Sequence, residues 1–244
     1  MAKTTTKSRI MTEGSIWKHL LFFAIPLLIG NLFQQLYNTV DSIVVGNFVG
    51  KEALAAVGTT DSIINTIIGF FMGMSTGAGV IISHYFGAKN DEGVHKAVHT
   101  TIAITIIMSV VFSILGVLLV PAMLHLMKTP DDVFDQSATY LRIYFAGGAG
   151  LMFYNMGSGI MRAVGDSKRP LYFLILSALI NTVLDVLFVA GFHWGVAGAA
   201  IATIIAQGIT AVLVMITLTR EKESYRIIWS KIHIYKEMLE KIFS

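Results

Sequence analysis

The chain has 244 residues, of which 55% are hydrophobic and 14% are charged, against roughly 25% charged residues in an average soluble domain. A mean hydropathy of +0.70 and long uncharged stretches indicate an all-α integral membrane protein with several spans. Cysteine is absent from the sequence, which excludes disulfides, thiolate catalysis and cysteine-ligated metals. The net charge of +3 does not indicate nucleic-acid binding, because most basic residues lie on one side of the predicted membrane spans, as in membrane proteins.

Residues 1–15 are polar and basic, and we expect them to form a cytoplasmic segment without a cleavable signal peptide. Residues 16–219 contain apolar stretches of the length that a spanning helix needs, about 20 residues. Residues 220–244 are basic and amphipathic, which predicts a helix along the cytoplasmic membrane surface. The apolar stretches predict a bundle of six transmembrane helices, at Leu20–Phe48, Ala53–Tyr85, Val98–Met123, Phe134–Met161, Leu171–Phe192 and Val196–Leu218.

Two features qualify these spans. Pro26 lies inside the first one, where a missing backbone hydrogen bond predicts a kink. All but three of the 18 Lys and Arg residues fall on one side of the predicted membrane, the exceptions being Lys51, Lys128 and Arg142. Because cytoplasmic loops carry the excess of basic residues, we expect a multi-pass protein of the cell membrane with both ends of the chain in the cytoplasm.

Two carboxylates, Asp41 and Asp185, lie inside predicted spans, where an ionised side chain costs several kcal/mol. At about 1.5 Å of rise per residue, both lie about 10 Å below the outer edge of the apolar layer, and Thr203 lies at the same depth. Asn181 precedes Asp185 by four residues and shares its helix face. These oxygens at one depth predict a shared site that binds a cation or moves a proton.

The first span also carries a polar stripe. Asn31, Gln34, Asn38 and Asp41 are spaced three, four and three residues apart, which places them on one helix face. The amides could serve only to hold helices together by hydrogen bonds, so the stripe leaves both roles open. Asp61 is also open: it is either a third carboxylate of the cavity or a residue near an exposed helix start.

Several short stretches follow one another along the chain in a specific order, although any one of them alone is weak. They are Ile25-Pro-Leu-Leu-Ile-Gly-Asn31, Tyr37-Asn-Thr-Val-Asp-Ser-Ile-Val-Val-Gly46, Ala53-Leu-Ala-Ala-Val-Gly58, Gly87-Ala-Lys-Asn-Asp91, Arg162-Ala-Val-Gly-Asp-Ser-Lys-Arg-Pro170 and Asn181-Thr-Val-Leu-Asp185. Together they resemble one family, multidrug and toxic compound extrusion (MATE), over nearly all of residues 10–244.

The resemblance implies a transporter rather than an enzyme, with two six-helix lobes and twelve helices in all. It implies export of amphiphilic, often cationic drugs in exchange for H⁺ or Na⁺, with no other cofactor. A complete member is close to twice as long, so we expect this chain to be a fragment that holds the amino-terminal lobe and lacks a carboxy-terminal partner lobe. The family's cation and possible Na⁺ ligands fall here on Asp41, Asn181, Asp185 and Thr203, with Gln34 nearby.

The remaining implied positions concern the substrate and the conformational change. The resemblance gives Pro26 a role in bending the first span, and Tyr140 and Asn155 match polar positions of the substrate cavity. Asn31 and Asn38, from the polar stripe, are expected to line the same cavity.

Two alternative functions also use polar or acidic residues within membrane spans. A flippase for lipid-linked oligosaccharides, from the same wider superfamily, would need a cavity rich in Arg and Lys, which the central parts of the spans lack. An intramembrane aspartyl protease also uses two aspartates but typically shows Tyr-Asp and Gly-x-Gly-Asp motifs. The corresponding pairs here are Val40-Asp41 and Leu184-Asp185, which makes the protease the more remote alternative.

Overall fold

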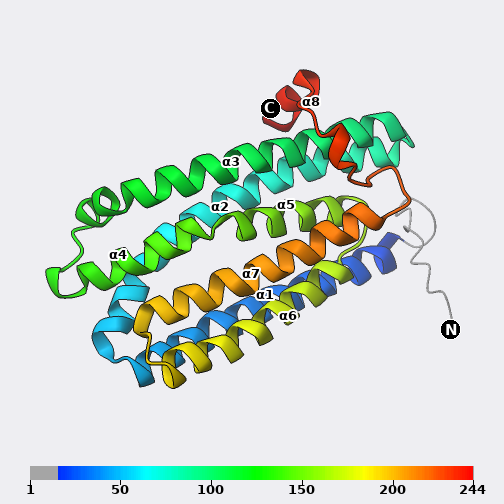
Figure 1. The fold of residues 1–244 in the computed structure, drawn as a ribbon. Coiled ribbons are helices and arrows are strands. Elements are labelled where there is room, and N and C mark those ends of the chain that lie inside the picture. The colour runs from blue at the N-terminus through cyan, green and yellow to red at the C-terminus, as the bar shows by residue number, and fades with distance from the viewer. Residues whose placement is uncertain (1–15, 244) are drawn as a thin grey trace.

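The computed structural model describes residues 16–243, which form helices and connecting turns with no strand. The long helices lie side by side as a bundle, and α8 lies across α2 and α3 (Figure 1). The elements are α1 (Ile16–Phe48), α2 (Lys51–Gly87), α3 (Asp91–Leu126), α4 (Asp131–Ala146), α5 (Ala149–Ala163), α6 (Lys168–Asp185), the π-helix η1 (Val186–Gly191), α7 (Gly195–Arg220), the 3₁₀ turn η2 (Trp229–Lys231) and α8 (Lys236–Phe243).

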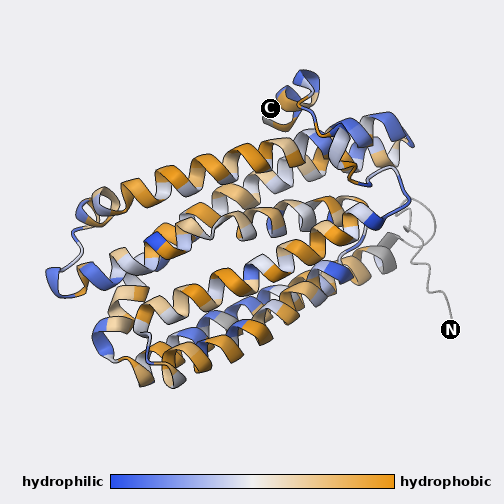
Figure 2. Ribbon diagram, viewed as in Figure 1, coloured by the Kyte–Doolittle hydropathy of each residue, from blue (hydrophilic) through white to orange (hydrophobic). Residues whose placement is uncertain are grey.

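Most of these helices are apolar along their length. Within the described residues, α1, α2, α3, α6 with η1, and α7 are each long and apolar enough to cross a membrane. Apolar residues cover the middle of the bundle and polar residues gather at its turns (Figure 2). Large side chains such as Phe22, Leu118 and Leu179 are exposed on its outer faces. Lipid chains can cover such surfaces, which supports the prediction of an all-α membrane bundle.

The prediction of one continuous helix over Phe134–Met161 is wrong, because the chain breaks into α4 and α5 at Gly147 and Gly148. The two helices follow one another along the bundle, so together they make one crossing (Figure 1). A Cβ added at Gly147 would lie 2.5 Å from Ile204, which shows how closely this break approaches α7. Paired glycines permit the break because they lack the side chains that would clash here.

The prediction of an amphipathic helix over residues 220–244 is wrong in its extent. Among the described residues after 220, only η2 and α8 are helical, and the chain between α7 and α8 returns to α3. Ile228 donates its backbone N–H to His99 Nε2 at 3.0 Å, and Tyr235 donates its own to Thr100 Oγ1 at 3.2 Å. Side-chain acceptors on α3 therefore replace helical hydrogen bonds along this segment.

Residues 1–15, the predicted cytoplasmic segment, lie outside the described residues. Pro26, where the sequence predicts a kink, is buried within α1, which runs as one helix from Ile16 to Phe48.

Candidate cation site and adjoining cavity

Asp41 and Asp185 meet where α1 packs against the end of α6. Asp41 is 7% exposed and Asp185 is fully buried, and their carboxyl groups are close enough to interact directly. Neither carboxylate forms an ion pair with a Lys or Arg in the described part of the chain. Two acids without a basic partner are a costly arrangement in an apolar bundle, and such arrangements usually have a functional role.

Asn181 and Thr203 lie beside this pair of acids. Both are buried, and Asn181 Nδ2 donates to Thr203 Oγ1 at 3.3 Å across the contact of α6 with α7. The start of α7 also lies close to η1: a Cβ added at Gly198 would lie 3.1 Å from Phe188. One turn separates Asn181 from Asp185 on α6, so the amide and the carboxylate point to the same side.

Several oxygens at this place lack a hydrogen-bond donor. Four buried side-chain oxygens have none among the described residues: Asp41 Oδ1, both carboxylate oxygens of Asp185, and Asn181 Oδ1. Carboxylate, amide and hydroxyl oxygens are the ligands that hard cations prefer, and a carboxyl pair can also hold a shared proton. No cluster of three or more His, Cys, Asp or Glu occurs in residues 16–243, so any metal here would rely on neutral oxygens as well.

The backbone changes form directly after Asp185. Residues Val186–Gly191 make the π-helix η1, and Trp194 closes it by donating its backbone N–H to Phe188 O at 2.9 Å. Phe188 stacks on Trp194 with ring centroids 5.0 Å apart, which supports the widened turn. π-Helical turns are rare and often occur at functional sites. Sequence reasoning missed this one because the stretch has ordinary helical hydropathy.

A second group of predicted residues lines a polar cavity of about 130 Å³ between α1, α2, α5, α6 and α7. Pro26, Asn31, Gln34 and Asn155 all border it, so the structure brings these four together. Gln34, which the resemblance places near the cation ligands, borders this cavity. Its lining also includes Tyr154 and Gln207, which sequence reasoning did not single out, and Arg162 from the stretch Arg162–Pro170.

A model of the MatE family matches residues 26–187. The chain belongs to the MATE family. It is 34% identical over 203 residues to the probable multidrug resistance protein YpnP of Bacillus subtilis, covering 83% of this chain and 46% of YpnP. A second B. subtilis protein, the probable multidrug resistance protein YoeA, is 34% identical over 215 residues, which cover 86% of this chain and 46% of YoeA.

Solved MATE structures show the same fold. A MOP superfamily transporter from Pyrococcus furiosus superposes with a TM-score of 0.89 and 29% identity, covering 99% of this chain and 53% of that one. An outward-facing multidrug resistance MATE transporter gives a TM-score of 0.88 and 30% identity, with 99% and 53% coverage. The chain therefore spans about half the length of the MATE relatives that it matches.

Three further positions lie apart from the cavity of this MATE bundle. Tyr140 is 4% exposed and packs in the core, stacked on Tyr144. Asn38 is exposed on α1, and neither residue lines the polar cavity. Asp61 is exposed on α2, yet its charge acts on both Asp41 and Tyr144, so it lies near the carboxyl pair without being part of its buried contact.

Proposed function

We propose that the chain forms the amino-terminal lobe of a secondary antiporter in the cell membrane, which exports amphiphilic or cationic drugs in exchange for H⁺ or Na⁺. The second lobe would complete the transporter, since alternating access requires two bundles that move about a central site. The observation that carries the proposal is the buried contact of Asp41 with Asp185, which has no basic partner in the described residues.

Electrostatics gives this contact its role. Two adjacent carboxylates in an apolar site cannot both remain ionised at low cost. A cation or a proton that enters from outside neutralises the pair, and Asn181 and Thr203 supply neutral oxygens beside it. Neutralisation removes repulsion between α1 and α6, so α1 can move at Pro26, which borders the polar cavity. The drug then loses contacts in that cavity and leaves.

The relative YpnP offers a test of transport. Exchange of its matching part for this chain gives a full-length chimera, and efflux of the cationic dye ethidium is measured from loaded cells. Asp41→Asn and Asp185→Asn should reduce efflux to background, because either change removes the charge that the coupling ion neutralises. Asp135→Asn, which alters an exposed acid on α4, should leave efflux unchanged. Unchanged efflux in both site variants would overturn the proposal.

A second measurement addresses the coupling ion and uses the purified chain alone. If Na⁺ binds at the carboxyl pair, the melting temperature should rise with NaCl but not with choline chloride, since a ligand of the folded state stabilises it by mass action. Asp185→Asn should abolish that rise. If H⁺ is the ion, NaCl and choline chloride should act alike, and a pH gradient without Na⁺ should drive efflux by the chimera.

A further inference from the structure

A larger cavity of about 550 Å³ lies at the end of the bundle that carries the turns 88–90 and 164–167. We call it the basic-end cavity. It is bordered by α1, α2, the end of α5 and the turn that follows α5. The carboxyl pair does not line it, so the proposed cation site does not account for it.

The charged residues of the basic-end cavity are both cations. Lys89 and Arg162 line it, and no Asp or Glu is among the described residues that do so. Arg162 is partly buried and also borders the polar cavity, so its side chain lies between the two spaces. Within residues 16–243 its guanidinium forms neither an ion pair nor a hydrogen bond. A sheltered guanidinium with unfilled donors favours an anionic ligand.

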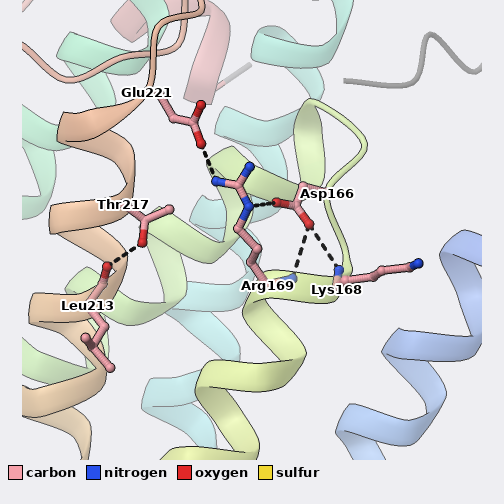
Figure 3. Close-up of polar contacts among 6 residues, drawn as sticks. All are labelled: Asp166, Lys168, Arg169, Leu213, Thr217 and Glu221. Carbon is pink, nitrogen blue, oxygen red and sulfur yellow. Dashed lines mark hydrogen bonds and ion pairs between the residues drawn. The ribbon is translucent and has the colours of Figure 1, made fainter. Parts of the chain in front are cut away.

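Two acids near this end of the bundle, Asp166 and Glu221, are both engaged by another arginine, Arg169 (Figure 3). Arg169 Nε contacts Asp166 Oδ2 at 2.8 Å, and its Nη1 contacts Glu221 Oε1. Asp166 also accepts the backbone N–H groups of Lys168 and Arg169, both at 3.2 Å, at the start of α6. Two acids are thus committed to one neighbouring cation, which leaves Arg162 without a carboxylate from this turn.

The rest of the basic-end cavity suits a hydrocarbon chain. Phe23, Leu27, Val80 and Phe86 form an apolar wall, and Val80 is also exposed on the outer face of α2. The hydroxyl groups that line the cavity are committed to backbone carbonyls: Ser75 donates to Asn155 O, Thr76 to Met72 O and Ser83 to Val80 O. The lining therefore offers cationic donors at one place and apolar surface elsewhere.

We propose that the basic-end cavity binds an anionic membrane lipid, with the lipid phosphate beside the Arg162 guanidinium and an acyl chain along the apolar wall. Basic pockets between membrane helices are a known form of lipid headgroup site. A cationic drug is repelled by Lys89 and Arg162, and an inorganic anion leaves the apolar wall without a partner. The site goes beyond the proposed antiport, because it concerns binding by this chain and requires no transport.

The test is native mass spectrometry of the purified chain in detergent, titrated with equal amounts of dioleoyl phosphatidylglycerol and dioleoyl phosphatidylcholine. The two lipids have the same acyl chains and differ in headgroup charge. The first lipid bound should be phosphatidylglycerol. Arg162→Gln should weaken that first binding by about tenfold or more, because charge-assisted hydrogen bonds contribute on this scale. The matched control is Lys168→Gln, which alters an exposed cation at the start of α6 that does not line the cavity.

A second variant tests the apolar wall without changing either cation. Ser83→Trp places a large ring in the cavity and should weaken binding of phosphatidylglycerol while circular dichroism and melting match those of the unaltered chain. Three results would overturn the proposal: phosphatidylglycerol affinity unchanged by both Arg162→Gln and Ser83→Trp, equal loss with Lys168→Gln, or displacement of the lipid by millimolar inorganic phosphate. The last result would assign the site to a free anion.

Discussion

Burial changes what a single acid can do in this molecule. Asp135 is exposed on α4 and needs no partner, whereas Asp185 is fully buried beside Asp41. A carboxylate that loses water must be paired or neutralised, and the described residues provide no basic partner for this one. The site is therefore a place where the fold tolerates a cost, which is common at functional sites.

Removal of that cost gives the first prediction. Asp185→Asn keeps the shape of the side chain and removes its charge, so the free energy of unfolding of the purified chain should rise by about 1–2 kcal/mol at neutral pH. Thermal melting in detergent measures this change. Asp135→Asn, the exposed control, should change the free energy of unfolding by less than about 0.5 kcal/mol. A loss of stability in Asp185→Asn would contradict the view that the carboxyl pair is strained.

The contact of α5 with α7 contains glycine, although glycine is a poor helix former. Both helices contain glycine at this contact, Gly150 on α5 and Gly208 on α7. A Cβ added at Gly150 would lie 2.9 Å from the backbone nitrogen of Gly208, whereas a Cβ added at Gly208 would meet nothing within 4 Å. The two residues face the same contact, but only Gly150 is required by it.

This asymmetry gives the second prediction. Gly150→Ala should lower the free energy of unfolding by about 1–3 kcal/mol, because backbone of α7 must shift to admit the methyl group. Gly208→Ala should raise it, by up to about 1 kcal/mol, because alanine is the better helix former and the space is open. Thermal melting of both variants in the same detergent measures these changes in the free energy of unfolding. Equal effects from the two substitutions would show that the contact is not as close on α5 as described.

At the scale of the whole molecule, the basic residues divide the bundle into two ends. The turn 88–90 and the turn 164–167 lie toward one end of the helices, together with the start of α1 and the end of α7 (Figure 1). The turn that contains Lys128 lies at the opposite end, between α3 and α4. The excess of Lys and Arg at the first end predicts that it faces the cytoplasm.

The third prediction tests this orientation and uses the absence of cysteine from the chain. Lys128→Cys should react with a membrane-impermeant maleimide added to intact cells, because the basic residues predict that its turn faces outside. Lys89→Cys should react only after the membrane is made permeable. Both positions are exposed, so access to the reagent and not burial decides the result. Labelling of Lys89→Cys in intact cells would reverse the assigned topology.

The class of the protein and the positions of most of its spans follow from the amino-acid sequence alone, and the sequence also predicts a depth for the polar residues. These properties are local: a helix in a membrane satisfies its own backbone, and its length follows from the apolar stretch. The equal depth of Asp41, Asp185 and Thr203 could be counted along the chain for the same reason. Asn181 was placed beside Asp185 by helical spacing alone.

The packing of the helices against one another sets which of these residues meet. It brought Asp41 against Asp185 and placed Asn181 against Thr203, because α1, α6 and α7 pack together. It broke the fourth span at Gly147 and Gly148, where α7 comes close. Depth is set by each helix alone, whereas contacts depend on how each helix is rotated and packed, and apolar composition carries little information about rotation.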